Sequence, residues 1–215
     1  MKNRIVTILL IIVFAGSIRF LPAQEVSIPD PGLNAAVREA LQKPTGPLTT
    51  QDLLSLTTLD AHSRNVTNLT GLEAARNLAT LDLRGNQITN VVLLPHMTNL
   101  TTLVLDDNPI QMLVLSEPMA TANLAGAVTN LQNQGVPVFA YPLMPQLVRP
   151  LQLVGAFKFG LIGPPGTYTI LQSTNLSDWS ALGTVSNPLG AINFTDVTAH
   201  DIPQRFYRAV PTTSP

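Results

Sequence analysis

Residues that could carry out catalysis or bind a metal ion are few in this sequence and widely spaced. The three histidines, His62, His96 and His200, are far apart, and none stands at the short spacing of a metal-ligand motif. The chain has no cysteine, which excludes disulfides, thiolate chemistry and lipid attachment through cysteine. No serine, histidine and aspartate set lies in a nucleophile-elbow context. We therefore expect neither an enzyme nor a cofactor or metal site.

Two short motifs contain residue types found in ligand-binding loops. Asp106-Asp107-Asn108 has calcium-ligand residues, but it lacks the alternating acids and the terminal glutamate of a calcium loop. Gly163-Pro-Pro-Gly166 has the glycines of a phosphate loop without the following lysine and helix. We interpret both as turns. An enzyme with an unrecognised site stays open as a third and weakest alternative for the function.

The first 23 residues have the features of a secretory signal peptide. Lys2 and Arg4 provide a positive start, 11 largely apolar residues follow, and Leu21-Pro-Ala23 offers a cleavage site. The apolar stretch is well short of the roughly 20 residues of a membrane span. We expect cleavage after Ala23 and a mature chain that is secreted, at the cell surface or in the periplasm, with no membrane span. An uncleaved anchor is the alternative, because leucine is not the small residue such a site prefers.

The composition is that of an ordered, weakly charged protein. Charged residues make up 12% of the chain and hydrophobic residues 45%. Lysine and arginine number 12 against 13 aspartates and glutamates, and three of the cations lie in the predicted signal peptide, so the mature chain has a formal charge of −4. Because no basic patch or basic stretch with aromatic residues stands out, we do not expect nucleic acid as a partner.

The residues between 56 and 113 repeat with a period of 22. Each copy opens with an apolar residue, and others follow 3, 5, 10 and 13 positions later. These positions are Leu56, Leu59, Ala61, Val66 and Leu69; Leu78, Leu81, Leu83, Ile88 and Val91; and Leu100, Leu103, Leu105, Ile110 and Leu113. A fixed period of this length is typical of a solenoid, in which stacked copies share one core. A helical stripe is the alternative, but these spacings do not follow a 3.6-residue period.

Each copy contains a short strand whose alternate residues face solvent. Leu81 and Leu83 share one face of such a strand, so the residues between and beside them point the other way. We expect nine of these outward residues to form a binding surface on the concave side of the solenoid: Thr58, Asp60, His62, Thr80, Asp82, Arg84, Thr102, Val104 and Asp106. Three strands at roughly 4.8 Å spacing give only a few hundred Å². A standard interface needs about 800 Å² from each partner, so other surfaces must contribute to tight binding, or the solenoid is a spacer.

Two of the copies carry a resemblance to a known family. Residues 78–89 (LATLDLRGNQIT) and 100–110 (LTTLVLDDNPI) resemble the leucine-rich repeat family and, within it, the 22-residue bacterial class of the internalin type. The first copy departs from the pattern at Ala61 and Arg64, where leucine and asparagine are usual, as fits an edge copy beside a cap. The resemblance implies an α/β leucine-rich-repeat solenoid that binds proteins, and it indicates no particular ligand.

Helical segments are expected on both sides of the repeats. Asp30 and Pro31 predict a capping helix within residues 28–42, and a second short helix follows from Thr49. Residues 24–55 would then form a helical N-terminal cap. They resemble the helical cap that precedes such repeats in many bacterial secreted proteins.

On the other side of the repeats, residues 117–134 have helical spacing and residues 136–140 resemble a strand. Together they would close a repeat domain that spans residues 56–140.

Beyond a proline-containing linker at 141–150, short alternating runs replace the repeats. Turn-forming residues separate five expected strands, at 151–159, 166–173, 179–186, 191–197 and 205–210. We predict a small all-β, antiparallel, sandwich-like domain over 151–215 that folds on its own. Its expected core contains Tyr168, Ile170, Phe194 and Phe206. For Trp179 we favour a place in the core over a role as a platform that binds sugar. The domain resembles a β-rich module that ends secreted proteins of environmental Gram-negative bacteria.

Two classes of function remain. The first is a secreted, non-enzymatic interaction or structural protein whose repeats bind a protein or a cell-surface component. The alternative is a carbohydrate- or surface-binding accessory protein with its specificity in the C-terminal module. Exposure of Trp179 and Tyr207 on one flat face would favour the alternative, and burial of both would disfavour it.

Overall fold

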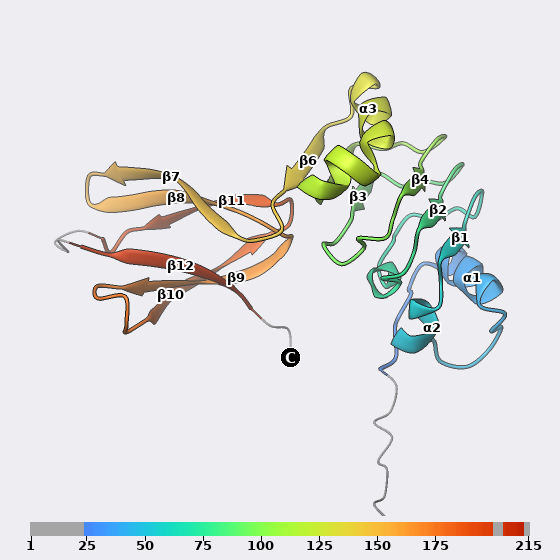
Figure 1. Cartoon of the computed structure of the whole chain (residues 1–215), viewed down its shortest axis with the longest axis horizontal. Coiled ribbons are helices and arrows are strands. Elements are labelled where there is room, and N and C mark those ends of the chain that lie inside the picture. The colour runs from blue at the N-terminus through green and yellow to red at the C-terminus, as the bar shows by residue number, and fades with distance from the viewer. Residues whose placement is uncertain (1–23, 200–203, 213–215) are drawn as a thin grey trace, which may run out of the picture.

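A computed structural model of the chain describes residues 24–199 and 204–212 (Figure 1). The predicted signal peptide at residues 1–23 lies outside the described residues. The described chain forms a repeat block, which carries the helices, and a β module that contains only strands (Figure 1). No helix in the described ranges is long and apolar enough to span a membrane.

Two helices precede the first repeat strand. α1 (Pro31–Ala40) begins after Asp30, whose carboxylate accepts a hydrogen bond from the Leu33 backbone N–H at 3.0 Å. α2 (Thr50–Leu54) begins after Thr49, which forms a reciprocal capping box with Asp52. The apolar faces of both helices enter the same core as the first repeat.

The 22-residue register predicted for the repeats is present in the first sheet. β1 (Thr58–Asp60), β2 (Thr80–Asp82) and β4 (Thr102–Val104) lie side by side in parallel. Leu59 pairs with Leu81, and Leu81 with Leu103, so equivalent residues of successive copies stack on one another. The stacked leucines point into a core that no single copy could bury alone.

A second parallel sheet forms the other side of the repeat block. It contains β3 (Asn90–Val92), β5 (Met112–Ser116) and β6 (Val138–Tyr141), in that order. Val91 and Leu113 pair across this sheet and are fully buried, as the repeat pattern predicts. The first copy has no equivalent strand; its chain instead turns through the short 3₁₀ helix η1 (Leu72–Ala74).

The segment between β5 and β6 closes one end of the core. The predicted helix at 117–134 is present in two pieces, the π-helical turn η2 (Met119–Asn123) and α3 (Ala125–Asn133). The four apolar residues of this segment are all buried, as its helical spacing predicts: Met119, Leu124, Val128 and Leu131.

Asparagine side chains join successive copies where the chain leaves the first sheet. The Asn86 Oδ1 atom accepts hydrogen bonds from the backbone N–H groups of Arg64 and Val66, at 3.0 and 2.9 Å. Its Nδ2 atom donates to the carbonyls of Ala61 and Leu83, at 2.8 and 2.7 Å. These bonds satisfy backbone groups that would otherwise be buried without partners.

In the first copy, where Arg64 replaces the asparagine, an aspartate from the N-terminal segment bonds the backbone three and four residues further on. The Asp30 Oδ2 atom accepts hydrogen bonds from the backbone N–H and hydroxyl of Thr67, at 2.9 and 3.0 Å, and from the Asn68 N–H at 3.1 Å. Arg64 itself forms an ion pair with Glu39 of α1 at 2.6 Å. Both residues therefore tie the helices to the first repeat.

The C-terminal β module consists of two three-stranded antiparallel sheets. One has the order β10-β9-β12 and the other β11-β8-β7. The strands are β7 (Gln146–Leu153), β8 (Ala156–Ile162), β9 (Gly166–Ser173), β10 (Ser180–Asn187), β11 (Ala191–Asp196) and β12 (Phe206–Pro211). Phe159 and Leu161 of β8 meet Tyr168 and Ile170 of β9 in one core, so the two sheets pack face to face.

Three expectations about this module were wrong in detail. The single strand predicted at 151–159 is a hairpin, because the chain turns at Val154 and at Gly155, which has a φ of +74°. Tyr207, and not Phe206, points into the core, since the strand lies one residue out of the predicted register. Trp179 lies half-buried in the loop before β10 and is outside the core cluster.

The linker predicted at 141–150 is not a free connection. Tyr141 ends β6 and is buried, and its hydroxyl donates to the Leu93 carbonyl at 2.6 Å. Residues from Gln146 onward already belong to β7. On the module side, Gly190 packs so closely on Tyr141 that an added Cβ would lie 2.9 Å from the Tyr141 Cβ. The β module is therefore docked on the repeat block at this joint.

Candidate functional site

The outer face of the β1–β2–β4 sheet carries the nine residues predicted as a binding surface. Six of them are exposed: Thr58, Asp60, His62, Arg84, Thr102 and Asp106. The other three, Thr80, Asp82 and Val104, are half-buried. Strand pairing places Thr58, Thr80 and Thr102 in one row and Asp60, Asp82 and Val104 in the next. The predicted residues therefore form one continuous surface.

Ion pairs within single copies hold the charged side chains of this face in place. His62 Nδ1 lies 2.6 Å from the Asp60 carboxylate, and Arg84 pairs with Asp82 in the same positions of the next copy. The hydrogen bond from the His62 side chain, followed by that from its backbone, lowers the pKa of Asp60. Both aspartates thus stay ionised at neutral pH, and each also accepts the backbone N–H two residues later.

The pKa of Asp82 is lowered by a balance of opposite effects. Partial burial raises it, whereas the hydrogen bonds and the charge of Arg84 lower it by more. The same contact raises the pKa of the Arg84 guanidinium. The second copy therefore presents the ion pair of Arg84 and Asp82, and the first copy presents the hydrogen-bonded His62 and Asp60 at the same positions.

A shallow hollow lies where the strands of the first two copies end. Four predicted residues line it, namely Asp60, His62, Asp82 and Arg84, and its volume is about 340 Å³. Ser63, Gly85 and Asp107 also line it, and strand alternation did not identify them because they belong to the turns that follow the strands. Asp106 lies in a different groove, beside α3.

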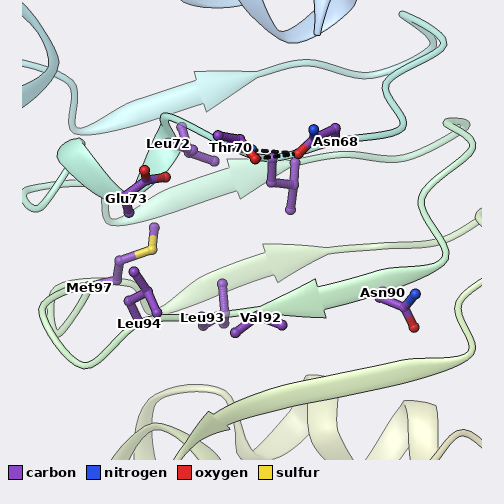
Figure 2. Close-up of a pocket in the computed structure, with 10 residues that line it drawn as sticks. Asn68, Thr70, Leu72, Glu73, Asn90, Val92, Leu93, Leu94 and Met97 are labelled. Carbon is purple, nitrogen blue, oxygen red and sulfur yellow. Dashed lines mark hydrogen bonds between the residues drawn. The ribbon is translucent and has the colours of Figure 1, made fainter. Parts of the chain in front are cut away.

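A second recess, which the sequence did not predict, separates the first two copies on the side of the second sheet (Figure 2). It has a volume of about 310 Å³, and its walls include Asn68 and Thr70 of the first copy and Asn90 and Val92 of β3. The recess exists because the first copy has no strand beside β3. Its backbone at residues 67 and 68 donates to Asp30 instead.

Two aromatic residues of the β module bear on carbohydrate binding. The Tyr207 ring stacks on Phe157 with 5.2 Å between centroids and 5° between planes, and its hydroxyl donates to the Asp196 carboxylate at 2.9 Å. The Trp179 indole N–H donates to the Leu176 carbonyl at 3.0 Å. Tyr207 thus has one ring face covered, and Trp179 is half-buried.

The titratable residues of the described chain do not gather into a metal site. Over residues 24–199 and 204–212, no three His, Cys, Asp or Glu side chains lie close enough to hold an ion together. Asp106 and Asp107 belong to the turn after β4, as their sequence context predicts.

A family model described as "Leucine Rich repeats (2 copies)" matches residues 76–117. These residues contain β2 to β5 and therefore the second and third copies. A comparison with curated proteins gives no match.

Several solved structures are similar to part of the chain. An internalin (inlF) from Listeria monocytogenes is 27% identical over 53% of this chain and 30% of its own, with a TM-score of 0.37. The functional domain of InlJ from the same organism is 30% identical over 41% and 21%, with a TM-score of 0.38. The CBM51-2 and INT domains of Clostridium perfringens ZmpB, in complex with GlcNAc, are 20% identical over 83% and 31%, with a TM-score of 0.35.

The chain spans less than a third of the length of each of these three structures. The family match covers two copies of the repeat block. The 22-residue strand register and the buried Asn86, which joins two copies, agree with that match. The chain therefore contains leucine-rich repeats, and the family match covers residues 76–117.

Proposed function

We propose that the chain is an exported, non-enzymatic protein whose repeats bind a protein or a protein component of the cell surface. The observation that carries the proposal is the outer face of the β1–β2–β4 sheet. Six of its nine outward residues stand in register on three strands, the other three follow the strand ends, and the leucines between them are buried. Leucine-rich repeats are mostly protein-binding scaffolds. In this chain, contacts between neighbouring side chains fix the polar groups of the accessible face in position.

The size of this face limits the interaction. With about 4.8 Å between strands and about 3.3 Å per residue, three short strands offer only a few hundred Å². A stable complex takes about 800 Å² from each partner. We therefore propose that binding is weak and transient, or that the partner also contacts the turns after the strands and the neighbouring α3.

The proposal also assigns roles to the N-terminal helices, the β module and residues 1–23. α1 and α2 would act as the N-terminal cap that shields the core of the first repeat from water. The β module would be a sandwich-like domain joined to the repeats at Tyr141. Export would follow from residues 1–23 acting as a cleaved signal peptide, which predicts Gln24 as the first residue of the mature protein.

The carbohydrate-binding alternative lacks a supporting observation in the β module. A flat platform would require both aromatic rings to be open to a sugar ring. Tyr207 instead stacks on Phe157 in the module core. Trp179 lies apart from it, in the loop before β10.

A capture experiment tests the proposed function. The mature protein is used to pull down proteins from cell-envelope fractions of its source organism, alongside the variant Thr80→Arg/Thr102→Arg. The matched control is Thr184→Arg, an exposed threonine on β10 of the β module. We expect the wild type and the control to retain one specific protein and the face variant to lose it, with unchanged circular dichroism. Equal capture by all three proteins would refute the proposed face.

A further inference from the structure

The first sheet of the repeat block ends at β4 with an open edge. After β4 the chain enters β5, passes through η2 and α3, and returns in β6, which pairs with β5. The second sheet therefore gains a strand beyond the last copy, whereas the first sheet gains none. No strand of residues 24–199 or 204–212 occupies the position beside β4, where a further copy would place its strand.

The backbone of β4 shows which groups face this open position. Val104 accepts a hydrogen bond from the Leu83 N–H at 3.0 Å, so its backbone faces β2. Because backbone groups alternate sides along a strand, the N–H and C=O of Leu103 face away from β2. The side chains at this end are also less covered: Leu103 and Leu105 are each 7% exposed, whereas Leu81 and Leu83 are fully buried.

A groove runs along this edge, between β4 and α3, which lies beyond β4 in Figure 1. Its volume is about 320 Å³, within the range of roughly 300–1,000 Å³ typical of ligand pockets. Leu103, Leu105 and Leu131 form an apolar floor, and Asn130 of α3 and the helix-capping Gln134 form the far wall. Asn and Gln carboxamides can both donate to and accept from the backbone of an added strand.

The charge of the groove indicates what it would accept. Among the described residues, Asp106 and Asp107 are the charged ones that line it, and both are exposed. No lysine or arginine of this described part lines the groove. An extended segment beside β4 would thus lie next to two carboxylates with no cation of this chain lining the same groove, which favours lysine or arginine on the segment.

We propose that this groove binds an extended, lysine- or arginine-bearing peptide segment of a partner protein, which adds to the first sheet as a strand beside β4. Main-chain hydrogen bonds to Leu103 would provide affinity, and the two aspartates would select for positive charge. The inference rests on the proposed protein-binding function and names the chemistry of the partner. It concerns the edge of the sheet, and the proposed function concerns its face.

The test uses the mature full-length protein and three synthetic, end-capped octapeptides of alternating lysine and valine. The first is unmodified, the second carries glutamate in place of lysine, and the third carries proline at two central positions. Binding is followed by fluorescence anisotropy and by amide chemical shifts in NMR spectra. We expect the lysine peptide to shift the amide signals of Leu103 and Leu105. The proline peptide should bind about tenfold more weakly, because it lacks backbone donors, and the glutamate peptide should not bind.

Two double variants separate this groove from general charge attraction. Asp106→Asn/Asp107→Asn should weaken binding of the lysine peptide about fivefold, the effect of two exposed charge pairs. Glu117→Gln/Asp178→Asn removes the same number of charges from exposed positions outside the groove and should leave binding unchanged.

Equal losses in both variants, equal binding of all peptides, or shifts that spare Leu103 would overturn the proposal. Concentration-dependent dimerisation that blocks the peptide would assign the edge to a second copy of the chain and also overturn it. If the lysine peptide fails while Thr80→Arg/Thr102→Arg still abolishes capture of the envelope protein, this inference falls and the proposed function stands.

Discussion

Asn86 and Asp30 show, at the scale of single residues, how polar side chains hold a leucine-rich core together. Asn86 is buried, and its amide bonds backbone groups of its own copy and of the copy before it. Asp30 performs the same task between α1 and the first copy, and it also caps α1. Both residues bond backbone groups of this chain, so we expect replacing them to lower its stability.

Replacing Asn86 with alanine should destabilise the repeat block by about 2–4 kcal/mol. The change leaves the N–H of Val66 and the carbonyl of Ala61 buried without partners, and each such group costs about 1–3 kcal/mol. Urea unfolding followed by circular dichroism measures the effect. Gln87→Ala is the control, since the Gln87 side chain is exposed and should change stability by less than about 0.5 kcal/mol. A loss for Asn86→Ala no larger than that of the control would contradict this role.

Asp30 should make the protein sensitive to acid. Burial raises the pKa of its carboxyl, but hydrogen bonds from the Leu33 backbone and from Thr67 outweigh this effect and lower it below its ordinary value. The ionised form is thus favoured in the folded state, and its stabilising contribution is present above the unfolded pKa of about 3.9. That contribution is lost as the pH falls through the lower, folded pKa.

The variant Asp30→Asn tests this linkage. Asparagine keeps one acceptor oxygen but cannot accept at both positions, so stability at pH 7 should fall by about 1–2 kcal/mol. The difference in urea midpoint between pH 7 and pH 3 should shrink in this variant. Asp107→Asn, at an exposed turn position, should keep the wild-type pH difference. An unchanged pH difference in Asp30→Asn would show that other carboxyl groups cause the acid sensitivity.

At the scale of elements, the repeat strands depend on one alternation between buried and accessible residues. Leu81 is fully buried at the centre of the first sheet, and Asp82 beside it keeps its side chain at the outer face. Leu81→Asp should abolish folding of the repeat block, because an unpaired buried charge is very costly. Asp82→Ala should cost about 1 kcal/mol or less, through loss of its exposed contacts with Arg84. Thermal melts compare the two; equal midpoints would mean that the strand register is wrong.

The sequence predicted those elements whose pattern repeats and missed those that depend on a single turn. The 22-residue period identified β1, β2 and β4 and the inward positions of the second sheet, because every copy repeats the same information. The hairpin around Gly155 was missed because its two strands are joined by a two-residue turn without a strong turn signal, so the run looked continuous. The helix split at Leu124 was missed because both pieces bury the same apolar stripe.

For the candidate site, alternation along a strand found Asp60, His62, Asp82 and Arg84, which line one hollow. It could not find Asp107, because a turn residue has no fixed side. The groove beside β4 also escaped, since it depends on β6 joining the second sheet and leaving the first sheet open. Such a choice of sheet is a tertiary property, and no local pattern encodes it.

At the scale of the whole molecule, Tyr141 couples the repeat block to the β module. It is buried, its hydroxyl bonds the Leu93 carbonyl on the repeat side, and Gly190 of the module packs against it. The boundary predicted for the independent domain at 151–215 falls inside β7, and the joint at Tyr141 predicts that the domain and the repeat block unfold together.

We expect the full chain to unfold in a single transition. Trp179, the only tryptophan, reports on the module by fluorescence, while circular dichroism reports on the whole chain. The two signals should coincide in the wild type and separate in Tyr141→Ala, which should lose about 3–5 kcal/mol of stability. Phe139→Ala, on the same strand but 43% exposed, should keep the signals together. Separate transitions in the wild type would instead show two independent units.

Site-specific photo-crosslinking can show whether the outer face of the β1–β2–β4 sheet binds a protein. A photoreactive amino acid is placed at Thr80 of the mature protein and, as the matched control, at Thr184 on β10, and each protein is irradiated with cell-envelope fractions. We expect a covalent adduct with one specific protein from position 80 and none from position 184. No adduct from position 80, or the same adducts from both positions, would contradict it.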